Sequence, residues 1–441
     1  MPLPSPDALL NAAEAVVVES RQAEFNRLRI ARDWAYAHPP APDQLARNPL
    51  CARQLGASEL LVRQFVEGEL GASLQLHALA ALRLMADAVD LESRMPATWA
   101  ALAELRLEVW VARKMAGLTM RLSADLARRV DAQVASVLGT QSPGRLLKLV
   151  EARVVEADQE LADRLAAERA AARGVWAGRP NGDGNTTVFA RADAAGVQRF
   201  MGMVEQVARL LREHCPELVD ESLDQLRARA MVMLGNPLAV LKLLVGTTEH
   251  DVPEVVAAAI REAPPSKTRP RTTVYVHLTT KALEGLGIAR AEELGALTRG
   301  RLVDLLGHEH VTLKPVIDLN DEAVADCYEV PADVSEQVNL AKPADCFPFA
   351  ESVSRRQDQD HTCAYRANGP PGQTRLSNLG HLVRRHHRIK TFAGWKVWQR
   401  DGIFFWLSPR GRTYVTDSRG THSLSVDVGG LDAVVDYVRA A

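Results

Sequence analysis

The stretch DHTCAYRANGPPGQTRLSNLGHLVRRHHRIKT, residues 360–391, decides how the C-terminal part of this chain folds. Asp360 and His361 are expected to end a strand, and the glycine- and proline-rich text that follows favours a loop. Asn378 then precedes Leu379–Lys390, whose apolar and basic residues have the spacing of a helix with Asn378 as its N-cap. The spacing therefore predicts a hairpin followed by a helix.

This arrangement brings together side chains that suit phosphodiester hydrolysis. That reaction needs a base to deprotonate water and an electrophile to neutralise charge on the phosphate. His361 is a candidate base, because imidazole titrates near neutral pH. Asp360 and His387 are candidate ligands of a divalent cation. Asn378 is a candidate for holding the hairpin against the helix, or for orienting His361 through its side-chain amide.

Two neighbouring histidines compete for the same role as a ligand. His386 and His387 are consecutive, and consecutive residues of a helix point about 100° apart. We therefore expect only one of them to bind the ion, and the register of the motif favours His387.

The predicted helix lies in a strongly basic block. Between Glu351 and Gly420 there are 13 Lys and Arg residues against 5 Asp and Glu, a local net charge of +8 in a chain whose total is −2. Such a block is typical of a module that binds polyanions, although a solvated basic face has the same composition. The residues expected to grip flanking phosphates are Arg384, Arg385, Arg388 and Lys390.

The run of Asp-His, sixteen further residues and NL-x-x-L-x-x-x-x-H-x-x-KT resembles the HNH, or ββα-metal, nuclease motif. More widely, the chain resembles GC-rich bacterial proteins that join a helical "domain of unknown function 222" to a C-terminal HNH domain. The text SRMPATWAALAELRLEVWVARKMAGLTMRLS (93–123) and YEVPADV (328–334) contributes to this likeness. The resemblance implies a metal-dependent endonuclease that acts on DNA. Its cofactor would be a divalent cation, Mg²⁺ or Mn²⁺, with Zn²⁺ or Ni²⁺ as alternatives.

The sequence departs from the family pattern at the positions expected to bind a structural zinc. Many HNH domains bind a structural zinc through two CxxC pairs, and this sequence contains no CxxC pair. Val383 and His386 occupy the helix positions that would be cysteine, and Phe347, Pro348 and Phe349 stand near the upstream pair. The resemblance therefore implies that no structural zinc is bound and that an apolar cluster takes its place.

The rest of the chain predicts further folding units, since 441 residues suffice for two to four of them. Helical periodicity predominates in the first half, with one long helix expected from Ser142 to Gly174 and a short strand at Thr187–Arg191. A proline-rich linker, Glu262–Thr272, separates this half from strand-like text at Thr273–Leu278 and Val311–Ile317. We expect an α+β multidomain protein with a helical domain of unknown function at 1–262, a mixed α/β segment at 273–342 and a small ββα domain at 343–425.

The composition indicates the environment in which the protein is expected to work. Apolar residues make up 47% and charged residues 24%, which is typical of a soluble globular protein. No run approaches the roughly 18 apolar residues of a membrane span, and the N-terminus lacks the basic region of a signal peptide. Five scattered cysteines argue against a disulfide framework. We therefore expect a cytoplasmic protein that binds DNA and no membrane, with its oligomeric state left open.

Two other interpretations remain. In one, the C-terminal domain is a non-catalytic module that binds nucleic acid or another partner, and the helical body is the functional part. In the other, it is the decayed nuclease of a mobile element. The intact set of Asp360, His361, Asn378 and His387 speaks against decay.

Overall fold

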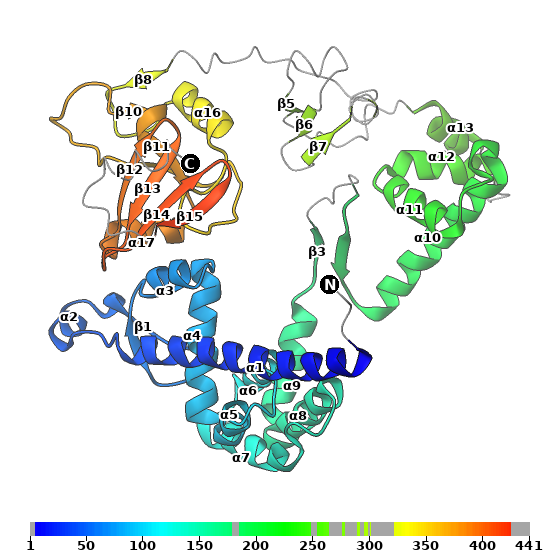
Figure 1. Ribbon diagram of the computed structural model, residues 1–441. Coiled ribbons are helices and arrows are strands. Elements are labelled where there is room, and N and C mark those ends of the chain that lie inside the picture. The colour runs from blue at the N-terminus through cyan, green and yellow to red at the C-terminus, as the bar shows by residue number, and fades with distance from the viewer. Residues whose placement is uncertain are drawn as a thin grey trace. The chain divides into compact units, whose positions relative to one another are not determined.

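The computed structural model describes residues 5–178, 185–247, 254–263 and 322–424, with short pieces at 276–277, 289–291, 295–298 and 300. The chain divides into two compact units. Unit 1 comprises residues 1–162 and 315–441, and unit 2 comprises residues 163–314. The structure thus divides the chain at other positions than 262 and 343. It joins the first 162 residues to the C-terminal segment (Figure 1).

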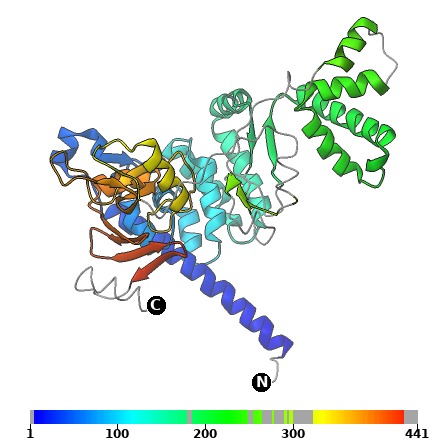
Figure 2. The same ribbon diagram turned by 90° about the horizontal axis from the view of Figure 1, so that it is seen from above.

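The N-terminal part of unit 1 is helical. Its longest helix, α1, begins with a proline after the N-cap Ser5, whose side chain accepts a hydrogen bond from Ala8 N. Only the second half of α1 is buried against other helices, and its first turns extend beyond them (Figure 2). The helices and strands are α1 (Pro6–Tyr36), α2 (Pro42–Arg47), β1 (Ala52–Gln54), β2 (Leu61–Arg63), α3 (Glu67–Ser73), α4 (Ala78–Arg94), α5 (Pro96–Ala103), α6 (Val109–Thr119), α7 (Ala124–Val134) and α8 (Pro143–Ala157).

The C-terminal part of unit 1 is rich in strands. Four of them, β12 to β15, form an antiparallel meander in chain order, and two two-stranded sheets, β8 with β10 and β9 with β11, precede it. The elements are β8 (Val324–Ala325), α16 (Ala332–Ala341), β9 (Asp358–His361), β10 (Thr374–Arg375), β11 (Leu379–Leu382), α17 (Arg384–Phe392), β12 (Lys396–Arg400), β13 (Ile403–Leu407), β14 (Thr413–Asp417) and β15 (Gly420–Leu424).

The expected order of a hairpin followed by a helix is present, but the predicted start of the helix is wrong. Leu379–Leu382 is a strand, because all four residues are buried and pair antiparallel with β9, Leu379 opposite His361 and Leu382 opposite Asp358. Helix α17 begins only at Arg384, after Val383 in extended conformation. The N-cap is therefore Val383, which has no capping side chain, and not Asn378.

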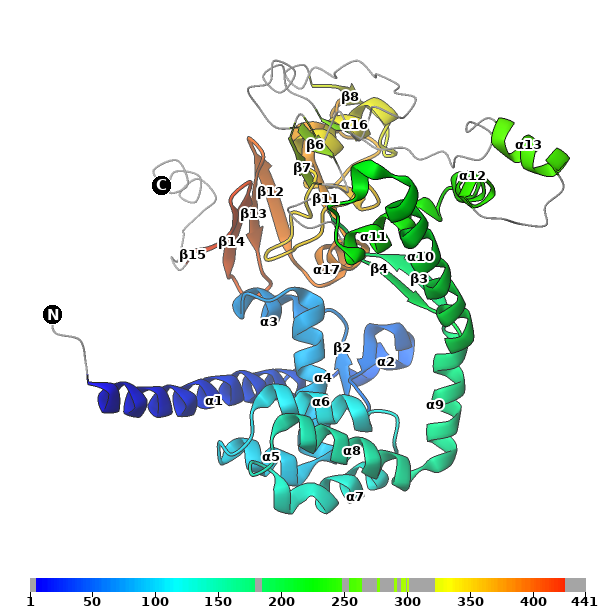
Figure 3. The same ribbon diagram turned by 90° about the vertical axis from the view of Figure 1, so that its right-hand side faces the viewer.

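The two parts of unit 1 share one hydrophobic core. Phe65, Ala72 and Ala78 from the N-terminal part belong to the same buried cluster as Ile389 of α17 and Trp406 of β13. Helix α3 lies beside α17 in two perpendicular views (Figures 1 and 3). A Cβ atom at Gly68 of α3 would lie 3.1 Å from Ile389 Cγ2, so the absence of a side chain there allows the close approach.

Unit 2 contains a helical bundle and two small sheets. Its core is formed where α10 packs on α11 and α12, with Val207, Ala208, Leu226 and Ala230 completely buried. The elements are α9 (Gln159–Ala171, which begins in unit 1), β3 (Gly174–Ala177), β4 (Val188–Arg191), α10 (Ala194–His214), α11 (Leu223–Met233), α12 (Pro237–Thr247), α13 (Glu254–Glu262), β5 (Val276–His277), β6 (Ala289–Ala291) and β7 (Gly295–Leu297).

Two expectations about this half are settled here. The single helix predicted from Ser142 to Gly174 is wrong, because Asp158 is extended and ends α8, and its carboxylate accepts from Leu161 N at the start of α9. The strand predicted at Thr187–Arg191 is confirmed as β4. The strand predicted at Val311–Ile317 lies outside the described residues.

The chain as described is mixed in class, with many helices, small sheets and a strand-rich C-terminal part. In the described ranges, no single helix has the length and apolarity to cross a membrane. One bent pair, α11 with α12, meets that test together at an angle of 118°.

Lys342 supports the loop in front of β11. Its ammonium donates to the carbonyls of Leu376 and, at 3.2 Å, Leu379. Burial lowers the pKa of Lys342 from 10.5 to about 8. Between these values the unfolded chain binds the proton more tightly than the folded chain, so the free energy of unfolding should rise with pH.

We expect Lys342→Met to lose this rise, which amounts to at most roughly 3 kcal/mol. Urea unfolding of both proteins from pH 7 to pH 10.5 would measure it. If the free energies of unfolding of the two proteins differ by the same amount at every pH, the assignment is wrong.

Candidate functional site

Asp360 and His387 meet at the end of the hairpin. Asp360 lies on β9 and His387 lies on the first turns of α17, and their atoms Oδ1 and Nε2 are 3.4 Å apart. The other ring nitrogen of His387, Nδ1, lies 2.9 Å from Asp358 Oδ2. A carboxylate only accepts, so Nδ1 carries the hydrogen, and in the neutral ring Nε2 presents its lone pair to Asp360.

This pairing has the chemistry of a donor set for a cation. When Nε2 carries no hydrogen, its lone pair and the Asp360 oxygen repel each other unless a positive charge lies between them. An ion about 2.1 Å from each atom, held at an angle of about 90–110°, would leave the two atoms about 3–3.4 Å apart. Asp358 behind the ring is the outer partner that metal-bound histidines commonly have. The residues present therefore fit a divalent cation.

Two side chains, those of Asp360 and His387, could hold an ion here. In the part of the chain that the structure describes, no group of three or more His, Cys, Asp and Glu side chains is arranged to hold a metal ion. Ions that keep several waters and bind through few protein ligands, such as Mg²⁺, suit such a site better than ions that need a closed cage.

Lys390 fixes the second oxygen of Asp360. Its ammonium lies 2.5 Å from Asp360 Oδ2 and also donates to the carbonyl oxygen of His361. One turn of α17 separates Lys390 from His387, so both side chains reach the same strand. The carboxylate of Asp360 is thereby oriented with Oδ1 toward His387.

His361 is buried at the last residue of β9. Its Nε2 lies 2.8 Å from Thr374 Oγ1, and the hydroxyl of Thr374 donates to the carbonyl of Cys327. Oγ1 must therefore accept from His361, which places the hydrogen on Nε2 and the lone pair on Nδ1. Among the described residues, Nδ1 has no hydrogen-bond partner. The threonine thus selects the tautomer in which Nδ1 is a base.

The surroundings of His361 lower the pKa of its imidazole. Burial lowers its pKa, Asp360 raises it and Lys390 lowers it again. The rings of Tyr328 and Tyr365 lie with centroids 5.7 Å from that of His361. Alternation along a strand turns His361 and Asp360 to opposite faces, and no direct contact joins His361 to His387 among the described residues.

Asn378 holds the loop and does not contact His361. Its carbonyl oxygen Oδ1 accepts from Thr362 Oγ1 at 2.9 Å and from Cys363 N at 2.8 Å. Its amide donates to the carbonyls of Cys363 and Gln373. These contacts hold the loop of the hairpin together, and none of them reaches α17.

The four basic residues of α17 have different surroundings. Arg385 pairs with the buried carboxylate of Glu67, and Lys390 is engaged by Asp360. Arg384 remains 75% exposed, 3.1 Å from Asp358, and Arg388 is exposed with its guanidinium over Phe65. Only Arg384 and Arg388 therefore present exposed guanidinium groups, four residues apart on one face.

His386 points away from the candidate site. It is completely buried, its Nδ1 lies 2.7 Å from Asp345 Oδ2, and its ring stacks on Phe347. Asp345 also accepts from the backbone N–H of Val383, directly before α17. His386 therefore belongs to the aromatic core around Phe347 and not to the candidate site.

Sequence reasoning missed three residues of this region. Asp358 had a local signal, because it lies two residues before Asp360 and so on the same strand face. Thr374 and Asp345 had none, since their partners His361 and His386 are 13 and 41 residues away.

The comparisons with known proteins identify relatives without a described activity. The chain is 35% identical to Uncharacterized protein Rv3776 of Mycobacterium tuberculosis over 141 residues, which are 31% of this chain and 25% of that protein. It is 32% identical to Uncharacterized protein Rv2100 of the same organism over 134 residues, 30% of this chain and 22% of that one. The chain thus matches about a quarter of the length of these relatives. No family model matches, and no solved structure matches.

Proposed function

We propose that unit 1 carries a metal-dependent endonuclease of the HNH, or ββα-metal, type that hydrolyses DNA phosphodiester bonds. The observation that carries the proposal is the approach of Asp360 Oδ1 to His387 Nε2 at 3.4 Å, with Asp358 oriented behind the imidazole. The order β9, β11, α17 and the threonine-fixed tautomer of His361 support it. The exposed arginines of α17 supply charge for the phosphates that flank the scissile bond.

The cation is assigned to Asp360 and His387. A divalent ion bound there supplies the positive charge that neutralises the phosphate and the leaving 3′ oxygen. The mixed carboxylate and imidazole set suits Mg²⁺ or Mn²⁺, and it also accommodates Zn²⁺ or Ni²⁺.

His361 performs the proton transfer. Its Nδ1 accepts a proton from a water molecule, and the water oxygen forms a bond to phosphorus as the bond from phosphorus to the 3′ oxygen breaks. The leaving oxygen takes up a proton from solvent. Lys390 orients the carboxylate of Asp360, and Asn378 holds the loop that follows His361.

Purified protein with supercoiled plasmid tests this function. A series of Mg²⁺ and Mn²⁺ concentrations should yield nicked circles, and EDTA should stop their formation. A shift in plasmid mobility without nicks at any metal concentration would overturn the proposal in favour of a non-catalytic nucleic-acid-binding module.

Asp360→Ala and His387→Ala should each lower the affinity for Mn²⁺ beyond detection by isothermal calorimetry, because each removes one of two protein ligands. Asp358→Asn should weaken binding by roughly 10- to 100-fold, since it changes the outer partner of His387 and leaves both candidate ligands in place. His422→Ala, an exposed histidine of β15, is the matched control. Wild-type affinity in either ligand variant would remove the ligand assignment.

Thr374→Val tests the tautomer of His361. Valine keeps the shape of threonine and removes the oxygen that accepts from Nε2, so the ring is no longer held with Nδ1 free. We expect nicking at saturating metal to slow by roughly 10- to 100-fold while Mn²⁺ affinity stays at the wild-type value. An unchanged nicking rate would show that Thr374 has only a packing role.

A further inference from the structure

A two-stranded ribbon in unit 2 exposes aromatic side chains. Strands β3 and β4 pair antiparallel, with Trp176 directly opposite Phe189. Trp176 is 52% exposed and Phe189 is 58% exposed. An isolated hairpin gains little stability by itself, and neighbouring exposed aromatics mark an interaction surface.

One face of this ribbon combines rings with a guanidinium. Opposite residues of an antiparallel pair share a face, so Trp176 and Phe189 lie on the same side as Gly174 and its partner Arg191. A Cβ atom at Gly174 would lie 2.5 Å from Trp176 Cζ2, which means that the indole ring lies over the glycine. The ring therefore extends toward the position of Arg191.

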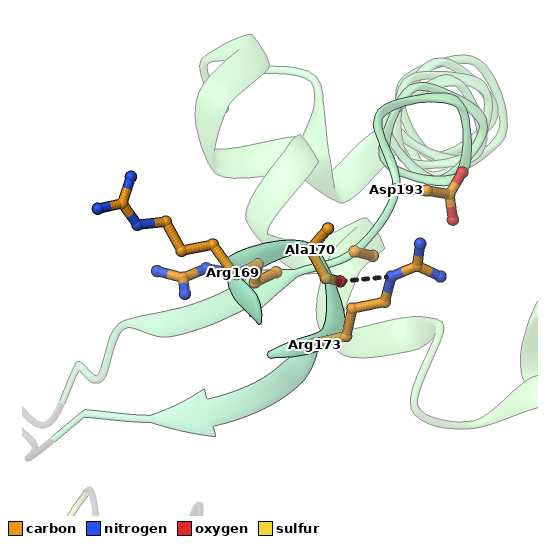
Figure 4. Close-up of a pocket in the computed structure, with 6 residues that line it drawn as sticks. Arg169, Ala170, Arg173 and Asp193 are labelled. Carbon is orange, nitrogen blue, oxygen red and sulfur yellow. Dashed lines mark hydrogen bonds between the residues drawn. The ribbon is translucent and has the colours of Figure 1, made fainter. Parts of the chain in front are cut away.

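The base of the ribbon continues into a basic pocket. A pocket of about 400 Å³ is lined by Arg169, Ala170, Arg173, Arg191, Ala192 and Asp193 (Figure 4). It lies where α9 ends and α10 begins, so the three arginines come from two separate segments of the chain.

The arginines of this pocket lack ionic partners in the described part of the chain. Arg173 Nε donates to the carbonyl of Ala170 at 3.2 Å, and no carboxylate lies within ion-pair distance of Arg169, Arg173 or Arg191 among the described residues. Asp193 is occupied as the N-cap of α10, where it accepts from Gly196 N at 2.7 Å. Elsewhere in the same unit, Arg229 pairs with Glu221 at 2.6 Å. The pocket therefore has a surplus of positive charge that no described side chain neutralises.

We propose that the ribbon face and the pocket at its base bind a single-stranded segment of DNA. Guanidinium groups suit phosphate oxygens because their forked donors match them, and exposed rings suit unpaired bases, on whose faces they stack. Charge complementarity thus selects a polyanion, and the adjacent rings select one with accessible bases. The choice of DNA rests on the proposed function of unit 1, while the site itself consists of other residues.

The test is fluorescence anisotropy of the full chain with a labelled single-stranded oligonucleotide, in EDTA so that nothing is cleaved. The variant with Arg169, Arg173 and Arg191 changed to Ala should bind at least tenfold more weakly. Three lost phosphate contacts should also reduce the slope of log affinity against log salt by about 2. Trp176→Ala with Phe189→Ala should weaken binding by roughly tenfold for each ring and leave the salt slope unchanged.

The matched control changes three other exposed arginines of unit 2, Arg164, Arg209 and Arg212, to Ala. It should bind within about twofold of wild type, and circular dichroism should show the same helix content in all variants. Equal losses in the control and the pocket variant would overturn the proposal. So would a pocket variant that loses as much affinity for a duplex of the same length as for the single strand.

A second copy of the chain is the other occupant to test for this face, and a measurement of self-association does so. If Trp176→Ala with Phe189→Ala converts a dimer into a monomer in light scattering and leaves DNA affinity unchanged, the face is a contact between copies and the proposal fails. The nuclease proposal is tested separately, because it depends on nicking by the wild-type chain. If the wild-type chain nicks plasmid but the pocket variant binds the oligonucleotide as tightly as wild type, only the inference about unit 2 is wrong.

Discussion

His361→Ala is expected to slow metal-dependent plasmid nicking by roughly 10²–10⁴-fold, the usual contribution of a positioned general base. The structure gives a specific reason. Thr374 commits Nε2 of His361 to a hydrogen bond, so Nδ1 is the atom left to accept the proton from water. The assay is the initial rate of nicked-circle formation at saturating Mn²⁺.

Added imidazole separates a missing base from a damaged fold. In His361→Ala, the vacated space next to Tyr328 and Tyr365 can admit free imidazole, which should restore part of the nicking rate in proportion to its concentration. Calorimetry should show Mn²⁺ affinity unchanged, since Asp360 and His387 remain. The control His422→Ala should nick at the wild-type rate. A His361→Ala protein that nicks as fast as wild type would make the base assignment wrong.

Glu67→Ala should destabilise unit 1 by about 3–5 kcal/mol, the usual cost of removing one partner from a buried ion pair. The side chain of Glu67 is 0% exposed and pairs with Arg385, which is itself largely buried. Without the carboxylate, the guanidinium would stay in the interface between α3 and α17 with no counter-charge. Urea unfolding monitored by tryptophan fluorescence would measure the loss, because Trp395 and Trp406 lie in the same core.

Two further variants show whether the pair itself is responsible. Glu67→Leu combined with Arg385→Leu should recover most of the stability, since apolar residues in place of both partners leave no buried charge unpaired. Glu104→Ala removes an exposed pair with Arg106 and should cost less than about 1 kcal/mol. The assignment would be wrong if Glu67→Ala lowered the free energy of unfolding by no more than Glu104→Ala does.

The Glu67–Arg385 contact also links the two parts of unit 1 to the proposed chemistry. Arg385 precedes His387 by two residues, so α3 is attached to the same turn of α17 that carries the candidate ligand. Arg410 adds a second attachment, because its backbone N–H and its guanidinium both bind Glu69 of α3. The helical segment before residue 100 is therefore part of the framework that holds the candidate site.

The candidate site was predictable in part because its chemistry is local. Asp360 and His361 stand at the end of one strand and His387 follows on one helix, so residue type and spacing bring the carboxylate and imidazole together. The start of that helix was predicted wrongly. Asn378 has the chemistry of an N-cap, but the backbone after it pairs with β9, and residues at a strand or a helix start share similar extended conformations.

Residue identity and spacing alone determined the order of hairpin and helix, the basic character of the C-terminal block and the pair Asp360 and His387. These features depend on residues that lie close to one another in the sequence. Only the tertiary structure decided that Arg385 pairs with Glu67, 318 residues away, that Asp345 supports the start of α17, and that Thr374 sets the tautomer of His361. No local pattern relates the segments that make these contacts, because the contacts depend on how the elements pack in a shared core.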